Sequence, residues 1–500
     1  MDEEKSSYRQ IMKATSIFGG VQVFQIIIMI IRSKFIAVLL GPTGMGIAGL
    51  FTSTLNLIAS FINLGLGTSA VKNVSIAYSS GDTTRISIII IVLKRLVLIF
   101  GIIGALFTLI LSKWLSVITF GNEDYTIAFA WISLAVLFKN ITTGQLVILQ
   151  GLRKIKYLAK ANLFGSFLGL VITIPLYYFY GLDAIVPGVI ITALLGFLLS
   201  WYFSGKIGII KVKVSKKRTL EESKDMLSMG VMLSLSGLMV MTSAYIVRVF
   251  ISTTGTLSDV GLYNAGFAII NTYVGLIFTA MATDYYPRLS SVAHNNKLCK
   301  ATINNQVELS FLIIAPIIIV FIVFIDWVIM FMYSTKFEGI DEMVRWAAIA
   351  MLFKIISWAI AFILLAKGAS KLFLINEIFA NIYNLVLSLL GYYYGGLTGL
   401  GIAFLIGYIV YLIHVIILTK RKYDFTFSNK FKEIFLVQFS LALCCFILIK
   451  ILDKDSLYSY FGGVLFIIIS SWYSYKKMDE LIGLKEILIS IKDKINIRRE

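Results

Sequence analysis

Two matching stretches of this sequence each place a lysine inside an apolar segment long enough to cross a membrane. The first runs from Trp131 to Lys139, and the second, 215 positions later, runs from Trp346 to Lys354. A cation at that depth costs about 3 kcal/mol on insertion scales, so its presence needs a reason. Lysine is a common ligand of phosphate and carboxylate groups. The pair therefore indicates a membrane protein that holds an anion.

Other polar residues of the apolar segments follow the same repeat. Arg32 aligns with Arg248 after a one-residue shift, and Asn56 aligns with Asn271. Gln25 precedes Arg32 by seven residues, which places both on one helical face. Polar side chains in a membrane helix face protein or water, not lipid. The residues predicted to bind the substrate are Arg32, Lys139, Arg248, Lys354, Asn56, Asn271 and Gln25.

Some of these residues have a simpler interpretation. Asn56 and Asn271 are also suited to hydrogen bonding between helices. Arg32 and Arg248 are also suited to the membrane interface near the outer leaflet. Both interpretations stay open at the level of sequence.

For Lys139 and Lys354 the alternative is an ion pair with a buried carboxylate. The spans offer few carboxylates: Glu308, Asp326 and Glu377, with Asp284 near an inner end. They cannot neutralise all the buried cations, so positive charge is left over for an anionic ligand. Asp326 and Glu377 are also the candidates for coupling transport to H⁺ or Na⁺. The membrane potential is the other candidate driving force, and no cofactor is expected.

The composition predicts an all-α polytopic membrane protein. Of 500 residues, 58% are hydrophobic and 14% are charged, with a mean hydropathy of +0.88. Soluble domains are less apolar and carry about a quarter charged residues. The apolar runs have the length of transmembrane helices, and a barrel would show shorter alternating segments. About 14 spans are predicted, at 15–39, 46–71, 86–111, 125–150, 157–180, 183–204, 226–251, 261–285, 306–332, 342–366, 372–394, 397–419, 433–451 and 457–475.

The distribution of positive charge predicts the orientation. With the N-terminus in the cytoplasm, the inner segments hold 33 lysines and arginines and the outer segments hold three. This bias follows the positive-inside rule and places both termini in the cytoplasm. It also explains most of the net charge of +18 without a nucleic-acid partner. Arg345 lies close to a span end, which predicts that its side chain reaches the interface by snorkelling.

The repeat predicts the domain organisation. Gly46 aligns with Gly261 at the offset of 215, and each half contains an even number of spans, so the two halves enter the membrane in the same direction. This gives two parallel six-helix lobes followed by two extra helices. The predicted parts are an N-terminal lobe (1–204), a basic cytoplasmic linker (205–225), a C-terminal lobe (226–419), helices 13 and 14 (420–475) and a basic amphipathic tail (476–500).

Sequence motifs of soluble enzymes are missing from the chain. It contains two histidines, His294 and His414, without metal-ligand spacing, so no metal site is expected. The single Asp-x-Asp, at Asp453 to Asp455, falls in a predicted outer loop. The glycine-rich segment Gly41 to Gly46 lies between two spans and is predicted to be a tight turn. We therefore expect a protein that is not an enzyme.

Several short segments resemble a known family, the bacterial flippases for undecaprenyl-diphosphate-linked repeat units of O-antigen and enterobacterial common antigen. These belong to the multidrug/oligosaccharidyl-lipid/polysaccharide exporter superfamily. The resemblance runs through the first twelve spans. The segments are Leu40 to Gly46, Phe120 to Tyr125, Tyr286 to Ser290, Lys336-Phe337, and Trp346 to Lys367.

The resemblance implies a flippase of the bacterial inner membrane that works by alternating access. It implies a central cationic cavity for the diphosphate and sugars, with Arg32, Lys139, Arg248 and Lys354 as its cations, and a groove for the prenyl tail. Membrane lipids are expected partners, and a polysaccharide polymerase and a chain-length regulator are candidate partners.

Three alternatives remain open: a peptidoglycan lipid-precursor flippase, a cation-coupled drug antiporter, and an integral-membrane polymerase or ligase. Drug antiporters of the superfamily use buried acids in the N-terminal lobe, where this chain carries cations. A polymerase or ligase needs a large outer loop, and the outer loops here are short.

Overall fold

The computed structural model describes residues 2–208, 210, 212–271, 275, 285–452, 456–483 and 485. The regular secondary structure of these residues is helical, as the sequence predicts. The chain forms two compact units, which are described separately. Unit 1 comprises Met1–Asn264 and Met332–Lys336, and unit 2 comprises Ala265–Phe331 and Phe337–Glu500. The division into two six-helix lobes with a linker at 205–225 stays a prediction.

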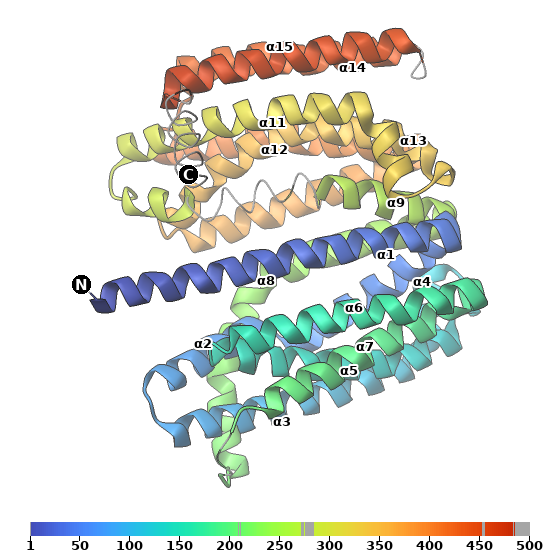
Figure 1. Ribbon diagram of the computed structural model, residues 1–500, viewed down its shortest axis with the longest axis vertical. Coiled ribbons are helices and arrows are strands. Elements are labelled where there is room, and N and C mark those ends of the chain that lie inside the picture. The colour runs from blue at the N-terminus through green and yellow to red at the C-terminus, as the bar shows by residue number, and fades with distance from the viewer. Residues whose placement is uncertain are drawn as a thin grey trace, which may run out of the picture. The chain divides into compact units, whose positions relative to one another are not determined.

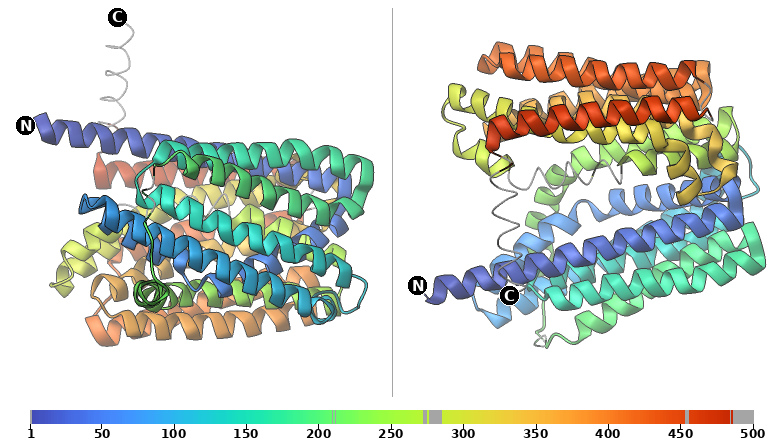
Figure 2. Two further views of the ribbon diagram at one scale, coloured as in Figure 1. Left: turned by 90° about the horizontal axis from the view of Figure 1, so that it is seen from below. Right: turned by 45° about the horizontal axis from the view of Figure 1, so that its top comes forward.

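Unit 1 is built from long helices that follow one another with short connections (Figure 1). Figure 2 shows α6 and α7 side by side, joined at one end by a short 3₁₀ turn. The elements are α1 (Asp2–Asn63), α2 (Leu66–Ser79), α3 (Thr83–Ile110), α4 (Ser112–Phe120), α5 (Thr126–Gly151), α6 (Ile155–Tyr180), η1 (Gly181–Ala184), α7 (Ile185–Gly205), α8 (Lys216–Thr254) and α9 (Leu257–Ile269), whose last turn enters unit 2.

Unit 2 has the same helical character. Its most buried element is α12, which is buried along most of its length and packs against α13. The elements are α11 (Asn296–Met332), η3 (Thr335–Ile340), α12 (Asp341–Ala366), α13 (Ser370–Tyr423), α14 (Asn429–Ile451) and α15 (Leu457–Ile482). The last residue of α11 and the first two residues of η3 belong to unit 1. The helices α14 and α15 pack on each other (Figure 1). Most of the predicted tail, and the segment Asp453 to Asp455, lie outside the described residues.

Ten helices of the described chain are long and apolar enough to cross a membrane. Three of these stretches, Phe24–Asn63, Ile155–Gly205 and Ser370–Tyr423, each overlap two predicted spans. The predicted span 261–285 includes residues outside the described part. The helices therefore agree with the predicted polytopic membrane fold.

A glycine divides the two spans of α1. Gly41 has φ 67° and ψ −170°, a conformation that residues with a β-carbon rarely adopt, and Pro42 has no backbone N–H to continue the helix. The predicted tight turn from Gly41 to Gly46 is wrong in its extent, because residues 42–46 are already helical. Gly396, with φ 56°, divides α13 in the same way.

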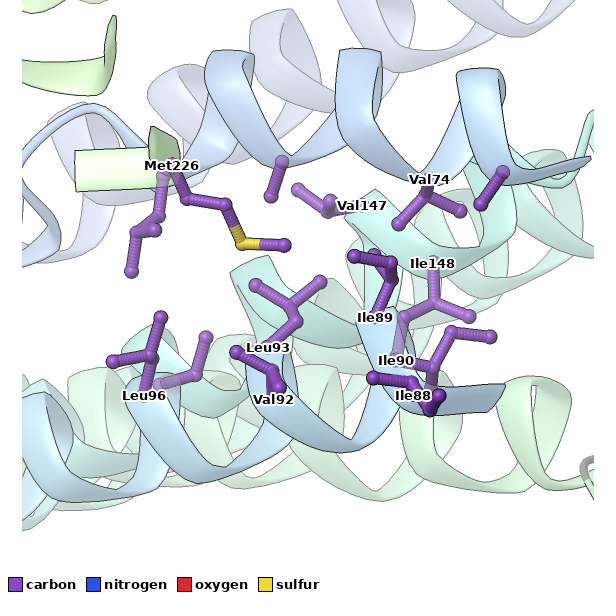
Figure 3. Close-up of a cluster of buried hydrophobic side chains, with 14 of the residues drawn as sticks. Val74, Ile88, Ile89, Ile90, Val92, Leu93, Leu96, Val147, Ile148 and Met226 are labelled. Atoms are coloured by element: carbon purple, nitrogen blue, oxygen red, sulfur yellow. The ribbon is translucent and has the colours of Figure 1, made fainter. Parts of the chain in front are cut away.

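A core of aliphatic side chains holds the first part of unit 1 together. Figure 3 shows Val74 of α2, Leu93 of α3, Ile148 of α5 and Met226 of α8 directed toward one another. Each is at most 1% exposed. Because this core fixes α5 against α2 and α3, it also fixes the direction in which the polar residues of α5 point.

The repeat is visible where α9 meets the second span of α1. Gly49 and Asn264 are 215 positions apart, and the amide of Asn264 lies directly against Gly49. A β-carbon at Gly49 would stand 2.1 Å from Asn264 Nδ2. Residues at equivalent positions of the two halves thus contact each other, as residues close to a pseudo-two-fold axis do.

Candidate substrate-binding site

Lys139 and Asn56 are brought together in unit 1. Lys139 lies on α5 and Asn56 on the second span of α1, and the ammonium of Lys139 donates a hydrogen bond to Asn56 Oδ1. Both side chains are half-buried. Asn56 supplies a dipole and no negative charge, so Lys139 is solvated but not neutralised.

The carboxylates proposed as partners of the buried lysines are engaged elsewhere. Within the described residues, Asp326 forms a salt bridge with Arg345 at 2.5 Å, Glu308 accepts a hydrogen bond from Ser428, and Glu377 accepts one from Tyr411 at 3.1 Å. Lys139 forms no salt bridge with any residue of the described part of the chain. Among the described residues Lys139 therefore has no carboxylate partner, and Asp284 lies outside the described residues.

Arg248 of α8 is also held by neutral groups. Its Nε donates to Asn264 Oδ1 at 2.8 Å, and Nη1 donates to the Ala244 carbonyl at 2.8 Å. Its guanidinium carbon lies 5.6 Å from the ring centroid of Tyr263. Hydrogen bonds and an aromatic face hold a guanidinium in place without cancelling its charge.

Lys354 lies on α12 in unit 2 and faces aromatic rings of α13. Its ammonium is 5.3 Å from the ring centroid of Tyr408 and 5.9 Å from that of Phe404. Aromatic faces attract a cation electrostatically. Lys354 is thus positioned by α13. Asn271, the counterpart of Asn56 in the sequence repeat, is exposed in unit 2.

Arg32 and Gln25 line one cavity in unit 1. The cavity has a volume of ≈ 270 Å³ and is enclosed by α1, α5, α6 and α7. Arg32 is the one charged residue among the described residues that line it. It forms no hydrogen bond or ion pair with the described part of the protein. The other polar side chains of the lining are Thr142, Asn162, Ser166, Thr192 and Ser200.

These hydroxyl and amide groups were missed by reasoning from sequence. Small polar residues in membrane helices often bond their own backbone, and Thr142 and Thr192 do so, at 2.8 and 2.7 Å. Their spacing could have identified them as residues of one helical face. Asn162 and Ser166 are four residues apart, and Thr192 and Ser200 are eight residues apart. Such rows run along one face of a helix.

The two ion-coupling candidates have different surroundings. Asp326 is paired with Arg345, which also bonds Asp341 at 2.8 Å. Glu377 receives hydrogen bonds from Tyr411 and, at 3.4 Å, from Asn376. Within the described residues Glu377 has no cationic partner. The ion pair with Arg345 accounts for the presence of a carboxylate at Asp326, whereas the hydrogen-bond donors around Glu377 are neutral.

The prediction that Arg345 snorkels is wrong. Arg345 is 4% exposed and sits between two carboxylates inside unit 2. The sequence held a signal for this pairing, because Asp341 precedes Arg345 by four residues on the same helix.

Comparison with known proteins shows which family the chain belongs to. The model of the family "Polysaccharide biosynthesis protein" matches residues 35–342, more than half of the chain. The chain belongs to this family. The match begins just after Arg32 and includes the helices that carry Asn56, Lys139 and Arg248.

The individual proteins that this chain resembles have low sequence identity to it. Lipid III flippase of Escherichia coli (strain K12) is 21% identical over 350 residues, which cover 69% of this chain and 82% of the relative. The solved structure of lipid II flippase MurJ in an inward closed conformation is similar, with a TM-score of 0.69 and 16% identity. It covers 92% of this chain and 99% of the MurJ chain.

An inward-facing multidrug resistance transporter of the MATE family is similar as well, with a TM-score of 0.66 and 17% identity. The match covers 80% of this chain and 94% of that chain. At these identities the solved structures establish the transporter fold, which agrees with the resemblance noted in the sequence.

Proposed function

We propose that this protein moves undecaprenyl-diphosphate-linked oligosaccharide units from the cytoplasmic to the periplasmic leaflet of the bacterial inner membrane by alternating access. Family membership and the similarity to lipid III flippase support a lipid-linked saccharide as the substrate. Alternating access and the cytoplasmic location of both termini belong to the same proposal.

The observation that carries the proposal is the hydrogen bond between Lys139 and Asn56. A cation inside an apolar helix is held by a neutral amide, while Asp326, Glu308 and Glu377 have partners other than Lys139. A diphosphate supplies the missing negative charge. We assign Lys139, together with Arg32, Arg248 and Lys354, to the phosphates of the substrate.

The cavity around Arg32 is suited to the sugars. Thr142 and Thr192 give their hydroxyl protons to backbone carbonyls, so their oxygens are left as acceptors. Sugar hydroxyls are donors that match such acceptors, and Gln25 and Asn162 offer both donors and acceptors. Its volume of ≈ 270 Å³ is at the small end of ligand pockets, which suits a short part of the substrate.

The membrane potential is one proposed driving force. For a net anion moving out of a cell that is negative inside, it contributes about 2.3 kcal/mol per charge per 100 mV. Proton coupling through Glu377 is the second proposed contribution. An association with a polysaccharide polymerase and a chain-length regulator stays a proposal that follows from the family.

Two alternatives make different predictions. A lipid II flippase, suggested by the fold similarity to MurJ, would rescue cells depleted of their own lipid II flippase. A drug antiporter would give resistance to cationic compounds when overproduced. The cations Arg32, Lys139 and Arg248 in unit 1 disfavour a cationic substrate, because like charges repel.

The test of the proposed site is binding of undecaprenyl diphosphate to the purified protein in detergent. Replacing Lys139 by Gln removes one charged contact, and we expect an affinity lower by about tenfold or more, since hydrogen bonds to charged groups contribute about 1.5–3 kcal/mol. Lys113→Gln is the control, because Lys113 is exposed and pairs with Glu123 at 3.0 Å. Equal affinity of the Lys139 variant and the control would show that Lys139 does not bind the diphosphate.

A further inference from the structure

A second basic cavity lies in unit 1 at the ends of several helices. Its volume is ≈ 360 Å³. It is bounded by the end of α2 at Tyr78, the start of α3 from Thr83, the turn between α5 and α6 at Lys154, and the residues after α7 from Lys206. None of the residues predicted from sequence to bind the substrate lines it.

The polar groups of this cavity favour an anion. Lys154 and Lys206 line it, and its described lining contains no acidic residue. Lys154 forms no ion pair or side-chain hydrogen bond with the described residues. The ammonium of Lys206 lies 4.3 Å from the ring centroid of Tyr202, a neutral partner. Hydroxyl groups complete the polar part of the lining; they belong to Tyr78, Thr83, Ser87 and Tyr157.

The nearest acid in sequence is already engaged. Asp82 immediately precedes α3 and accepts hydrogen bonds from the backbone N–H groups of Thr84 at 2.8 Å and Arg85 at 3.0 Å. Its carboxylate therefore caps the positive end of α3. The two lysines of the cavity keep their charge available for a ligand.

The rest of the lining is apolar. Ile86 and Ile90 of α3, Leu152, Ile207 and Ile210 contribute to the same cavity. A free inorganic anion makes no favourable contact with such an apolar surface. A ligand that joins a phosphate to hydrocarbon chains matches both parts of the lining.

The cavity also lies at the ends of apolar helices, where lipid headgroups are expected. Apolar helices of membrane-spanning length begin at Thr83 and Ile155 and end at Gly205, and all three ends border the cavity. The count of lysines and arginines assigns this end of the spans to the cytoplasm. Anionic lipids are concentrated in the cytoplasmic leaflet, and basic pockets between transmembrane helices on this side bind their headgroups.

We propose that this cavity binds the headgroup phosphate of an anionic glycerophospholipid from the cytoplasmic leaflet. Lys154 and Lys206 contact the phosphate, and the hydroxyls of Thr83 and Tyr157 donate hydrogen bonds to its oxygens. The isoleucines of the lining contact the first part of the acyl chains. This site does not depend on the proposed transport function.

A resident phospholipid fits better here than the phosphates of a transported lipid. Lys139, which we assign to the transport site, is 13 residues before Leu152 along α5. At 1.5 Å per residue the two positions are about 20 Å apart. One diphosphate cannot contact both sites at once, so the proposed phospholipid site is separate from the transport site.

The test uses the purified full-length protein in detergent and counts bound lipid by native mass spectrometry. The probes are phosphatidylglycerol, phosphatidylcholine and undecaprenyl diphosphate, each titrated separately. The variant carries Lys154→Gln and Lys206→Gln. The control carries Lys420→Gln and Lys422→Gln, which remove two exposed charges from the end of α13 on the same predicted side of the membrane.

We expect the first bound phosphatidylglycerol to lose affinity by about 25-fold in the Lys154/Lys206 variant, because each lysine near an anionic lipid contributes about a factor of five. Binding of phosphatidylcholine should be weak and unchanged, and the control should bind like the original protein. A Lys154→Arg, Lys206→Arg variant should retain binding, which separates loss of charge from loss of fold.

Three results would overturn the proposal. The first is equal binding of phosphatidylglycerol and phosphatidylcholine by the original protein. The second is an equal loss of phosphatidylglycerol in the Lys420/Lys422 control. The third is a loss of undecaprenyl diphosphate without a loss of phosphatidylglycerol, which would assign the cavity to the transported lipid.

Discussion

Gly46 and Gly261 occupy equivalent positions of the sequence repeat and lie against each other in the structure. A β-carbon on Gly46 would stand 1.9 Å from the carbonyl oxygen of Leu257, and one on Gly261 would stand 1.8 Å from that of Pro42. Each glycine thus contacts the backbone that precedes its counterpart. This reciprocal contact is what a pseudo-two-fold axis between the two helices produces.

Alanine at either of these glycines should therefore weaken the packing of α9 on α1. Gly46→Ala forces two backbones apart, and overpacking of this kind costs about 1–3 kcal/mol. We expect a lower midpoint of thermal unfolding in detergent. Gly237→Ala is the matched control, because a β-carbon there meets no atom within 4 Å and alanine favours a helix. A Gly46→Ala protein as stable as the control would contradict the close contact.

Asn56 offers a way to neutralise Lys139 without removing it. Asn56→Asp places a carboxylate where the amide oxygen now accepts the hydrogen bond from Lys139. We expect a folded protein with transport reduced about as strongly as by loss of Lys139, because an internal carboxylate competes with the diphosphate. Asn56→Ala removes the hydrogen bond but leaves the charge, so it should retain more transport. If Asn56→Asp transports better than Asn56→Ala, the charge of Lys139 is not what the substrate uses.

The cluster of Arg345, Asp326 and Asp341 should stabilise unit 2. Arg345→Met leaves two carboxylates close together without a cation, and breaking a buried pair in this way costs about 3–5 kcal/mol. Asp326→Asn keeps the bond between Arg345 and Asp341, at 2.8 Å, so its effect should be smaller. Thermal unfolding of the two variants compares these effects. If both variants unfold at the same temperature as the original protein, the cluster does not stabilise unit 2.

Glu377 is the carboxylate through which we propose proton coupling. Glu377→Gln keeps the shape and the hydrogen bond from Tyr411 but cannot exchange a proton. In vesicles we expect transport by the original protein to respond to an imposed pH gradient, and transport by the Gln variant to ignore it. Tyr411→Phe retains the carboxylate and should retain the response. A response that persists unchanged in the Gln variant would exclude Glu377 as the coupling group.

The sequence was sufficient to predict the helical membrane fold and the positions of the buried cations. Length, apolar periodicity and the spacing of polar breaks are local properties, so the spans could be located without knowledge of packing. The helix break at Gly41 could also be placed, although its extent could not. How far a helix continues past such a glycine depends on its neighbours, here α9 against residues 46 and 49.

The partners of the cations could not be predicted, because they depend on how helices are rotated against each other. Lys139 and Asn56 are both predicted site residues, yet no local feature of the sequence indicates that they contact each other. Because Arg345 lies close to a span end, its sequence position suggested an exposed side chain. In the folded chain it instead pairs with Asp326, 19 residues earlier. The small hydroxyl residues that line the cavity with Arg32 could be recognised as site residues only from that cavity.

The most direct test of the account is transport of an undecaprenyl-diphosphate-linked oligosaccharide in vesicles that contain the purified protein. The measurement is the fraction of lipid that becomes accessible to an externally added, membrane-impermeant reagent over time. With Lys139→Ala and Lys354→Ala combined, we predict that the rate falls to that of protein-free vesicles, while the Lys113→Ala control transports normally. An unchanged rate in the double variant would contradict the central claim that these two lysines bind the transported anion.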